Sequence, residues 1–214
     1  MRPRRVPVKS AAFRRRARRI ASSATLRIMA GSRLPIVRAD LRLSTPMHPN
    51  SFSLMSEFVQ GYLRGVTPGT VLDVGSYDVN GNYKSLWKGW EYLGVDIETG
   101  PNVDRLVSVS GEFDLGQQYD VVISGQCLEH CNNPFTLAAT MGKHLKPGGL
   151  ACWIAPAKWP EHRHPQDCWR FLPDGMRHLL VHAGIEPLEV GMCPANEPHL
   201  DGADCFGVGR KRQA

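Results

Sequence analysis

From residue 51 onward, short apolar segments alternate with segments of helical spacing, and this alternation limits the folds open to the chain. Strands that are apolar throughout must be covered on both faces, as in a parallel sheet between two layers of helices. The segments with the length and character of strands are 70–74, 92–95, 106–109, 121–124, 150–154, 187–190 and 205–208. The segments expected to be helical are 51–63, 83–87, 134–145 and 173–183.

These segments predict an α/β fold: a Rossmann-like, doubly wound, mostly parallel seven-stranded sheet with helices on both faces. In such sheets, ligands bind beyond the carboxyl ends of the strands. The residues that directly follow the predicted strands are therefore the first candidates for a binding site.

Charge is distributed unequally along the chain. Residues 1–39 contain 12 basic residues and no acidic residue, so the other residues carry more acids than bases. An acidic body disfavours a domain that binds nucleic acid over a generally basic surface. We predict a basic N-terminal extension over residues 1–40 and a folded domain over residues 41–214.

The basic extension has four open interpretations. It could be a disordered tail, an amphipathic helix on a membrane surface, an arm that binds nucleic acid, or an organelle-targeting peptide. If the protein contacts nucleic acid or a membrane surface, we expect the contact to involve only residues 1–38.

The cysteines and the hydropathy indicate a compartment. The sequence has no apolar run of about 18 residues, which a membrane-spanning helix needs, and no apolar signal core. Its six cysteines are scattered without a CxxC pair. We therefore predict a cytoplasmic protein with reduced, mostly buried thiols.

Carboxylates and a glycine stand at the ends of the first two predicted strands. The first strand runs into Asp73-Val74-Gly75-Ser76, where a glycine lets a ligand approach the backbone. The second ends at Asp96, 23 residues after Asp73 and close to the roughly 20-residue spacing at which an acid reaches ribose hydroxyls. A nicotinamide enzyme is not indicated, because the GxGxxG segment that cradles a pyrophosphate is absent.

Two further motifs follow in order along the chain. The fourth predicted strand leads into Gly125-Gln126 and then into a Cys-Leu-Glu-His segment that ends at His130. The segment 145–149, with the letters LKPGG, forms a turn before the fifth strand. The first motif faces the expected ligand, whereas the second is structural.

Together, LDVG, GS-x-DVNG, LEH and LKPGG resemble the class I S-adenosylmethionine-dependent methyltransferases, in particular a small type-11-like subgroup, over about residues 52–190. The resemblance implies methyltransferase activity with S-adenosyl-L-methionine as cofactor. It further implies that Asp73, Gly75 and Ser76 line the methionine portion, Asp96 binds the ribose, Ile97 packs on the adenine, and Gly125 and Gln126 border the sulfonium.

The sequence departs from that family pattern in two places. The loop after the first strand lacks the usual GxGxG, which leaves open which of Tyr77, Asp78 and Asn80 touch the cofactor; Tyr77 is included among the predicted cofactor-binding residues. No acid follows the third strand where relatives often place an adenine-binding aspartate, and the backbone of Ser110 and Gly111 is the expected substitute.

The loop over residues 155–171 concentrates aromatic, histidine, acidic and basic side chains at the edge where the methyl group would lie. A hydroxyl acceptor needs a base, and a histidine oriented by a carboxylate suits that task. We predict His164 as the base, Asp167 as the residue that orients it, and His130 as the competing base. Structural roles for these residues stay open, as does a divalent metal on the pattern His162-x-His164-x-x-Asp167; the prediction is that no metal is bound.

The sequence thus predicts an enzyme that methylates a small-molecule or saccharide acceptor at oxygen. Two alternatives are kept. One is a nucleic-acid methyltransferase that uses the Arg-rich extension as an electrostatic arm. The other is a cofactor-binding module without catalytic activity. The sequence does not predict the oligomeric state.

Overall fold

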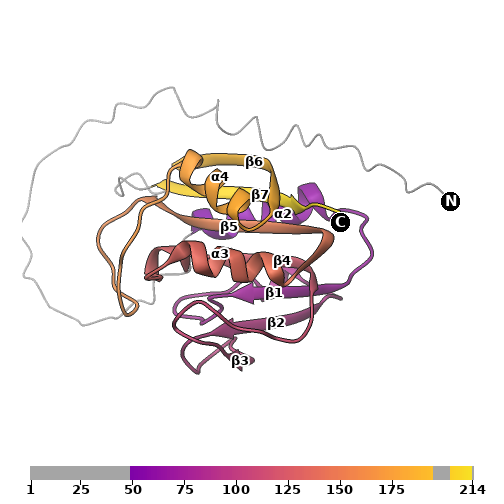
Figure 1. Ribbon diagram of the computed structural model, residues 1–214, viewed down its shortest axis with the longest axis horizontal. Coiled ribbons are helices and arrows are strands. Elements are labelled where there is room, and N and C mark those ends of the chain that lie inside the picture. The colour runs from indigo at the N-terminus through magenta and orange to yellow at the C-terminus, as the bar shows by residue number, and fades with distance from the viewer. Residues whose placement is uncertain (1–48, 195–202, 214) are drawn as a thin grey trace, which may run out of the picture.

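The computed structural model describes residues 49–194 and 203–213 (Figure 1). The predicted basic extension, and its boundary with the folded domain near residue 40, lie outside the described residues. Within the described residues, one seven-stranded sheet carries helices on both faces. This confirms the predicted α/β fold.

The sheet is mostly parallel. Its strands are β1 (Thr70–Val74), β2 (Glu91–Asp96), β3 (Arg105–Leu106), β4 (Tyr119–Gly125), β5 (Leu145–Lys158), β6 (Ile185–Pro194) and β7 (Ala203–Lys211). Their order is β3-β2-β1-β4-β5-β7-β6, and only β7 runs antiparallel to its neighbours. The strand order reverses between β1 and β4, so the carboxyl ends of these two strands flank the crevice where such sheets bind ligands.

Among the described residues, three α-helices cover the sheet: α2 (Pro49–Tyr62), α3 (Pro134–Lys143) and α4 (Pro173–His182). Figure 1 shows α3 and α4 on the near face and α2 on the far face. Each face has its own cluster of buried apolar side chains, with Leu137 and Leu179 in one and Met55 and Phe58 in the other. Burial on both faces explains why the central strands are apolar throughout.

Helix α3 begins where the sequence supplies a cap. The Asn133 side chain accepts hydrogen bonds from the backbone N–H groups of Phe135 (3.1 Å) and Thr136 (3.2 Å), and Pro134 occupies the first turn. This cap fixes the exit of the segment that follows β4. After α3, Gly148 has a φ of 79°, which a residue with a side chain rarely adopts, so the LKPGG turn depends on this glycine.

Two predicted elements are shorter than expected. The helix predicted over 83–87 is a 3-10 turn, η1 (Lys84–Leu86), because Tyr83 and Trp87 are buried anchors whose spacing of four imitates helical periodicity. The strand predicted over 106–109 pairs only at Arg105 and Leu106. Beyond Val107, which donates its N–H to the Asp96 carbonyl (2.9 Å), the chain turns away through hydrogen bonds among its serines.

The six cysteines all lie within the described residues, and none of them forms a disulfide. The prediction that they are mostly buried is wrong, because only Cys152 and Cys205 are buried and Cys168 is exposed. Cys168 lies in the loop after β5, where its backbone N–H donates to the Glu129 carbonyl (2.7 Å).

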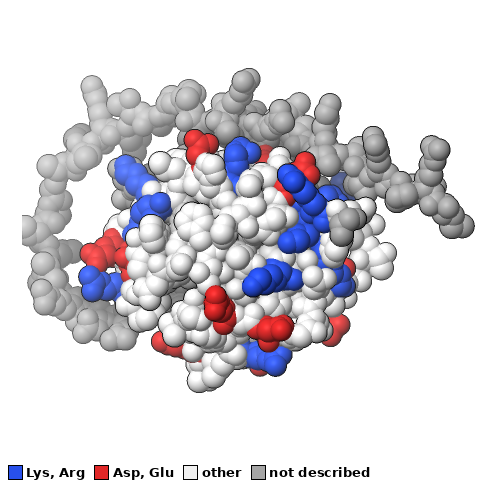
Figure 2. Space-filling view, in the orientation of Figure 1, with Lys and Arg blue, Asp and Glu red and all other residues white. Residues whose placement is uncertain are grey.

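No helix within residues 49–194 and 203–213 combines the length and apolar character needed to cross a membrane. The predicted cytoplasmic location stays a prediction. On the face seen in Figure 2, positive and negative side chains are interspersed among uncharged ones. This face is therefore not a basic patch of the kind that binds nucleic acid through its phosphates.

Candidate active site

A cavity of about 460 Å³ opens at the carboxyl ends of the parallel strands, within the size range of small-molecule sites. Every residue that the sequence predicted to bind the cofactor lines it: Asp73, Gly75, Ser76, Tyr77, Asp96, Ile97, Gly125 and Gln126. The two candidate bases, His130 and His164, line it as well. The fold thus brings two separately predicted sets of residues to one cavity.

Asp73 ends β1 with a buried carboxyl group that is only partly satisfied. The Tyr92 hydroxyl donates a hydrogen bond to Oδ2, whereas Oδ1 has no hydrogen-bond partner among the residues that the structure describes. Burial raises the pKa of Asp73 from 3.8 to about 7, and the nearby charge of Asp96 adds to this effect, while the bond from Tyr92 opposes it. A cationic ligand beside Oδ1 would favour the ionised form and satisfy the orphaned oxygen.

Gly75 follows β1 with a φ of 80°. A Cβ atom at this position would overlap the side chain of Cys127, which enters from the loop after β4. The N–H groups of Gly75 and Ser76 both donate to the carbonyl of Val95 on β2, at 2.9 and 3.1 Å. Glycine is therefore required, because the Cys127 side chain fills the space that a Cβ would take.

Ser76 lines the cavity, but its hydroxyl points elsewhere. Its Oγ donates to the carbonyl of Asn102 (2.9 Å), and the Asn102 amide donates in return to the Ser76 carbonyl (2.9 Å). This reciprocal pair ties the loop after β1 to the loop after β2. The Ser76 side chain therefore has a structural partner already.

Asp96 ends β2 and organises the next residues around its carboxylate. Its Oδ2 accepts the N–H of Tyr77 (3.0 Å), and its Oδ1 accepts the N–H of Ile97 (2.7 Å). Oδ1 also accepts the N–H of Glu98 (3.3 Å), so Oδ2 is the oxygen that can accept a further hydrogen bond. Ile97 follows with 39% of its surface exposed, so an apolar face stands beside a carboxylate, as the adenosine half of the predicted cofactor requires.

At the end of β4, Gly125 and Gln126 border the cavity mainly through their backbone. A Cβ at Gly125 would overlap the hydroxyl of Tyr83, and Gln126 has a φ of 57°. The Gln126 side chain turns toward β7, where its amide donates to Oδ1 of Asp204 (3.0 Å).

The loop after β5 is fastened to the short 3-10 helix η2 (Leu128–His130). The Glu129 carbonyl accepts the N–H groups of Cys168 (2.7 Å) and Trp169 (3.2 Å). Gln166 donates its side-chain amide to the His130 carbonyl (2.8 Å). These bonds hold the candidate acceptor loop against the cavity.

The prediction that Asp167 orients His164 is wrong, because the Asp167 carboxylate binds other residues. The Asp167 carboxylate receives two bonds from the Arg170 guanidinium, at 2.5 and 2.7 Å, and one from the His162 N–H, at 2.8 Å. Arg170 holds the pKa of Asp167 well below its usual range. Because Arg170 lies three residues further along the same loop, it binds the carboxylate that the sequence assigned to His164, and Asp167 acts on His162 instead.

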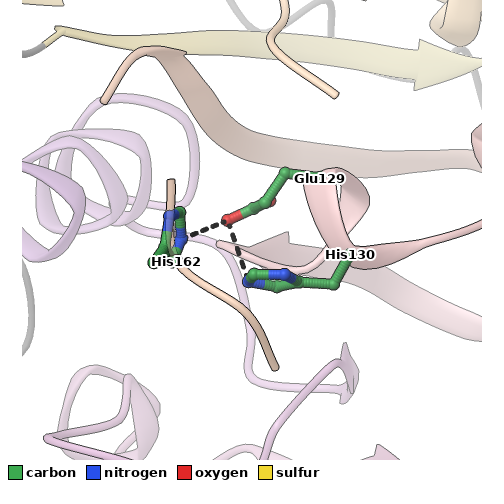
Figure 3. Close-up of side chains that lie close together, drawn as sticks. All are labelled: Glu129, His130 and His162. Carbon is green, nitrogen blue, oxygen red and sulfur yellow. Dashed lines mark ion pairs between the residues drawn. The ribbon is translucent and has the colours of Figure 1, made fainter. Parts of the chain in front are cut away.

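Three side chains converge where η2 meets this loop (Figure 3). Oε1 of the buried Glu129 lies 3.6 Å from Nε2 of His130 and 3.8 Å from Nε2 of His162. Glu129 raises the pKa of His162 above its ordinary value of 6.5. The His164 ring is 5.7 Å from that of His130, centre to centre, and is exposed at the cavity rim.

Glu129 and His162 are functional candidates that the sequence analysis missed. Glu129 stood inside the quoted LEH motif, and His162 inside the weighed pattern of metal ligands. Their 33-residue separation gives no periodic signal, so the pairing could be found only once the loop after β5 was placed against η2.

Solved structures share this fold at low sequence identity. The 1,6-didemethyltoxoflavin-N1-methyltransferase of Burkholderia thailandensis is 21% identical, with a TM-score of 0.61 over 76% of this chain and 79% of that one. The N-methyltransferase NodS of Bradyrhizobium japonicum is 13% identical, with a TM-score of 0.57 over 81% and 93%. The [4+2]-cyclase SpnF is 14% identical, with a TM-score of 0.56 over 75% and 81%. No curated protein matches the chain significantly.

The sequence profile of a family described as "Methyltransferase domain" matches residues 47–184. The match spans the sheet from β1 to β5, both halves of the cavity and helix α4. The chain is therefore an enzyme that belongs to the methyltransferase domain family.

Proposed function

We propose that this enzyme transfers the methyl group of S-adenosyl-L-methionine to a hydroxyl oxygen of a small-molecule or saccharide acceptor. The observation that carries the proposal is the single cavity, which joins the carboxylates at the ends of β1 and β2 to the histidines of η2 and the loop after β5. The small type-11-like subgroup indicated by the motifs is part of this proposal.

The donor end of the cavity fits the cofactor in charge and shape. The carboxyl group of Asp73, which lines the cavity, suits a cationic group, and Asp96 with Ile97 offers a carboxylate beside an apolar surface. S-adenosylmethionine supplies a methyl group already activated on a positive sulfur. The residues of the chain therefore need only bind, orient and exclude water around it.

The acceptor end holds groups that can take a proton. Methylation of a hydroxyl releases its proton, and His164 and His130 line the cavity within reach of a bound acceptor. Asp167 is a positioning residue, because it acts through His162 and is itself held by Arg170. The Burkholderia thailandensis enzyme, whose structure contains 1,6-didemethyltoxoflavin, supports a small-molecule acceptor, although its name specifies a nitrogen.

Isothermal titration with S-adenosylmethionine tests the donor half. We expect the wild type to bind and Asp96→Ala to lose at least about tenfold in affinity, because the carboxylate is proposed to hold the ribose. Asp174→Ala, which removes an exposed acid in the first turn of α4, is the matched control and should bind as the wild type does. Absence of binding by the wild type, or undiminished binding by Asp96→Ala, would refute the proposal.

The acceptor half is tested by giving the enzyme S-adenosylmethionine together with each member of a panel of phenols, polyols and monosaccharide derivatives. Formation of S-adenosylhomocysteine then reports methyl transfer. We expect turnover with at least one hydroxyl acceptor. His164→Ala should lower kcat for that acceptor, because the general base is gone. Turnover with amine acceptors alone would show that nitrogen, not oxygen, is methylated.

A further inference from the structure

The side chain of Glu129 has no hydrogen-bond partner among the described residues, although two histidines lie within 4 Å of it. Its side chain is fully buried, and neither carboxylate oxygen accepts a hydrogen bond from any residue within 49–194 and 203–213. A buried carboxylate without partners is strongly unfavourable, so such groups are normally paired, protonated or bound to a metal. The carboxylate points toward the two imidazoles of His130 and His162 (Figure 3).

The hydrogen bonds of these histidines fix which ring nitrogen carries the proton. Nδ1 of His130 lies 2.5 Å from the Gln166 carbonyl, and Nδ1 of His162 lies 3.1 Å from the Pro160 carbonyl. A carbonyl oxygen only accepts, so each Nδ1 must donate. In the neutral ring, Nε2 then presents a lone pair. When both rings are neutral, two lone pairs face the carboxylate of Glu129, an arrangement that repels unless a proton or a metal cation lies between them.

The distances favour a metal cation over shared protons. The gaps of 3.6 and 3.8 Å between Glu129 Oε1 and the two Nε2 atoms are too long for hydrogen bonds. Two ligands that each bind a zinc ion at about 2.1 Å with tetrahedral geometry lie about 3.4 Å apart. The three ligand atoms of Glu129, His130 and His162 all lie within 4.8 Å of one another, so a small inward movement would close them around one ion.

We propose that Glu129, His130 and His162 bind one divalent transition-metal ion of the zinc type at the acceptor end of the cavity. Two imidazoles and one carboxylate suit such an ion better than Mg²⁺ or Ca²⁺, which prefer all-oxygen sites. The carbonyls of Gln166 and Pro160 are the outer partners that orient the two rings, as metal-binding histidines require. Three protein ligands would leave a fourth position for water or an acceptor, as in catalytic sites, and His130 and His162 both line the cavity.

The metal defines the acceptor more closely, an extension that rests on the proposed function. An acceptor hydroxyl bound at the open position would have its pKa lowered by the ion. Its proton would pass to His164 as the O–C bond forms and the C–S bond breaks, with the electron pair of the C–S bond left on sulfur. His130 is a ligand in this arrangement, which leaves His164 as the base. The preferred acceptors are therefore oxygen donors to a metal, such as phenols with a neighbouring oxygen.

Metal binding is tested on the full chain after chelator treatment, with Zn²⁺ alone titrated against a chromophoric chelator and Co²⁺ followed by its visible absorption. We expect one ion per chain. Glu129→Gln and His162→Ala should each weaken Zn²⁺ binding by at least about 100-fold, because each removes a direct ligand, and loss of an outer hydrogen-bond partner alone already costs about 10- to 100-fold. Circular dichroism of each variant reports whether it is folded.

Two control variants separate this site from other ligands. His178→Ala removes an exposed histidine of α4, and Cys131→Ser removes a thiol that lines the same cavity; both should bind Zn²⁺ as the wild type does. No stoichiometric binding, equal affinity in Glu129→Gln, or loss of binding in Cys131→Ser would overturn the proposed ligand set. Titration of the metal-free chain with S-adenosylmethionine keeps the outcomes distinct, because cofactor binding without metal binding refutes this inference and leaves the proposed function intact.

Discussion

Asp73→Asn should make the folded protein more stable than the wild type at neutral pH. The carboxyl group is buried, and its pKa is raised from 3.8 to about 7 by that burial. Between these two values the folded state holds a proton that the unfolded chain has lost, so the stability of the wild type falls as the pH rises from about 4 to about 7. Asparagine keeps an oxygen to accept the Tyr92 hydroxyl and has no charge to bury.

The size of the effect follows from that difference in proton affinity. A pKa difference of one unit between the folded and unfolded states corresponds to about 1.4 kcal/mol. Ionisation of Asp73 therefore destabilises the folded state, relative to the unfolded chain, by about 4 kcal/mol at pH 8. The gain in Asp73→Asn should be absent at pH 3.5, grow through pH 5 and 6, and level off above pH 7. A gain of this order is large against the roughly 5–15 kcal/mol that stabilises a typical domain.

Urea unfolding, followed by tryptophan fluorescence at several values between pH 3.5 and 8, measures the free energy of unfolding of both proteins. Asp174→Asn, which changes an exposed acid, is the control and should track the wild type. If the wild type and Asp73→Asn show the same dependence on pH, or if the variant is less stable at pH 8, the reasoning about the buried carboxyl is wrong.

Three further predictions concern the loops around the cavity. Gly125→Ala should cost about 1–3 kcal/mol of stability, because its Cβ overlaps the Tyr83 hydroxyl, and Tyr83→Phe in the same chain should restore part of the loss in a thermal melt. Gly75→Ala should lower both stability and S-adenosylmethionine affinity, since its φ of 80° and the contact with Cys127 both oppose a side chain; wild-type values in both assays would contradict this. Arg170→Gln should lower Tm by several degrees at pH 7, because Arg170 pairs with Asp167 and lowers the pKa of its carboxyl group. The difference in Tm from the wild type should narrow in acid, since protonation of Asp167 removes the stability gained from the pair. A gap that widens below pH 4 would contradict the last prediction.

The strands were predictable because burial on both faces leaves a direct mark on the sequence. Val121–Ser124 and the other apolar runs could fit only inside a covered sheet, and all seven lie on or overlap strands of the structure. Tyr83 and Trp87 misled the helix prediction, since two anchors four residues apart look the same whether the backbone between them is α-helical or a 3-10 turn.

The donor residues were predictable for a related reason. Asp73 and Asp96 lie at the carboxyl ends of β1 and β2, and Gly75 directly follows β1, so the strand positions determine where these residues lie. The acceptor residues depend on how an irregular loop turns. No local sequence pattern predicts that Asp167 pairs with Arg170 rather than with His164. None predicts that Glu129 lies beside His162, which is 33 residues further along the chain.

Strand β7 has a consequence for the order in which the enzyme becomes functional. It lies between β5 and β6, although the ribosome makes it after both. While the chain is being synthesised, β6 has no place in the sheet until β7 emerges and pairs with β5. Asp204 on β7 also accepts hydrogen bonds from Gln126 at the cavity and from Asn50 on α2 (2.8 Å). The nascent protein therefore cannot form the bond that holds Gln126 beside the cavity until β7, its last described strand, has been made.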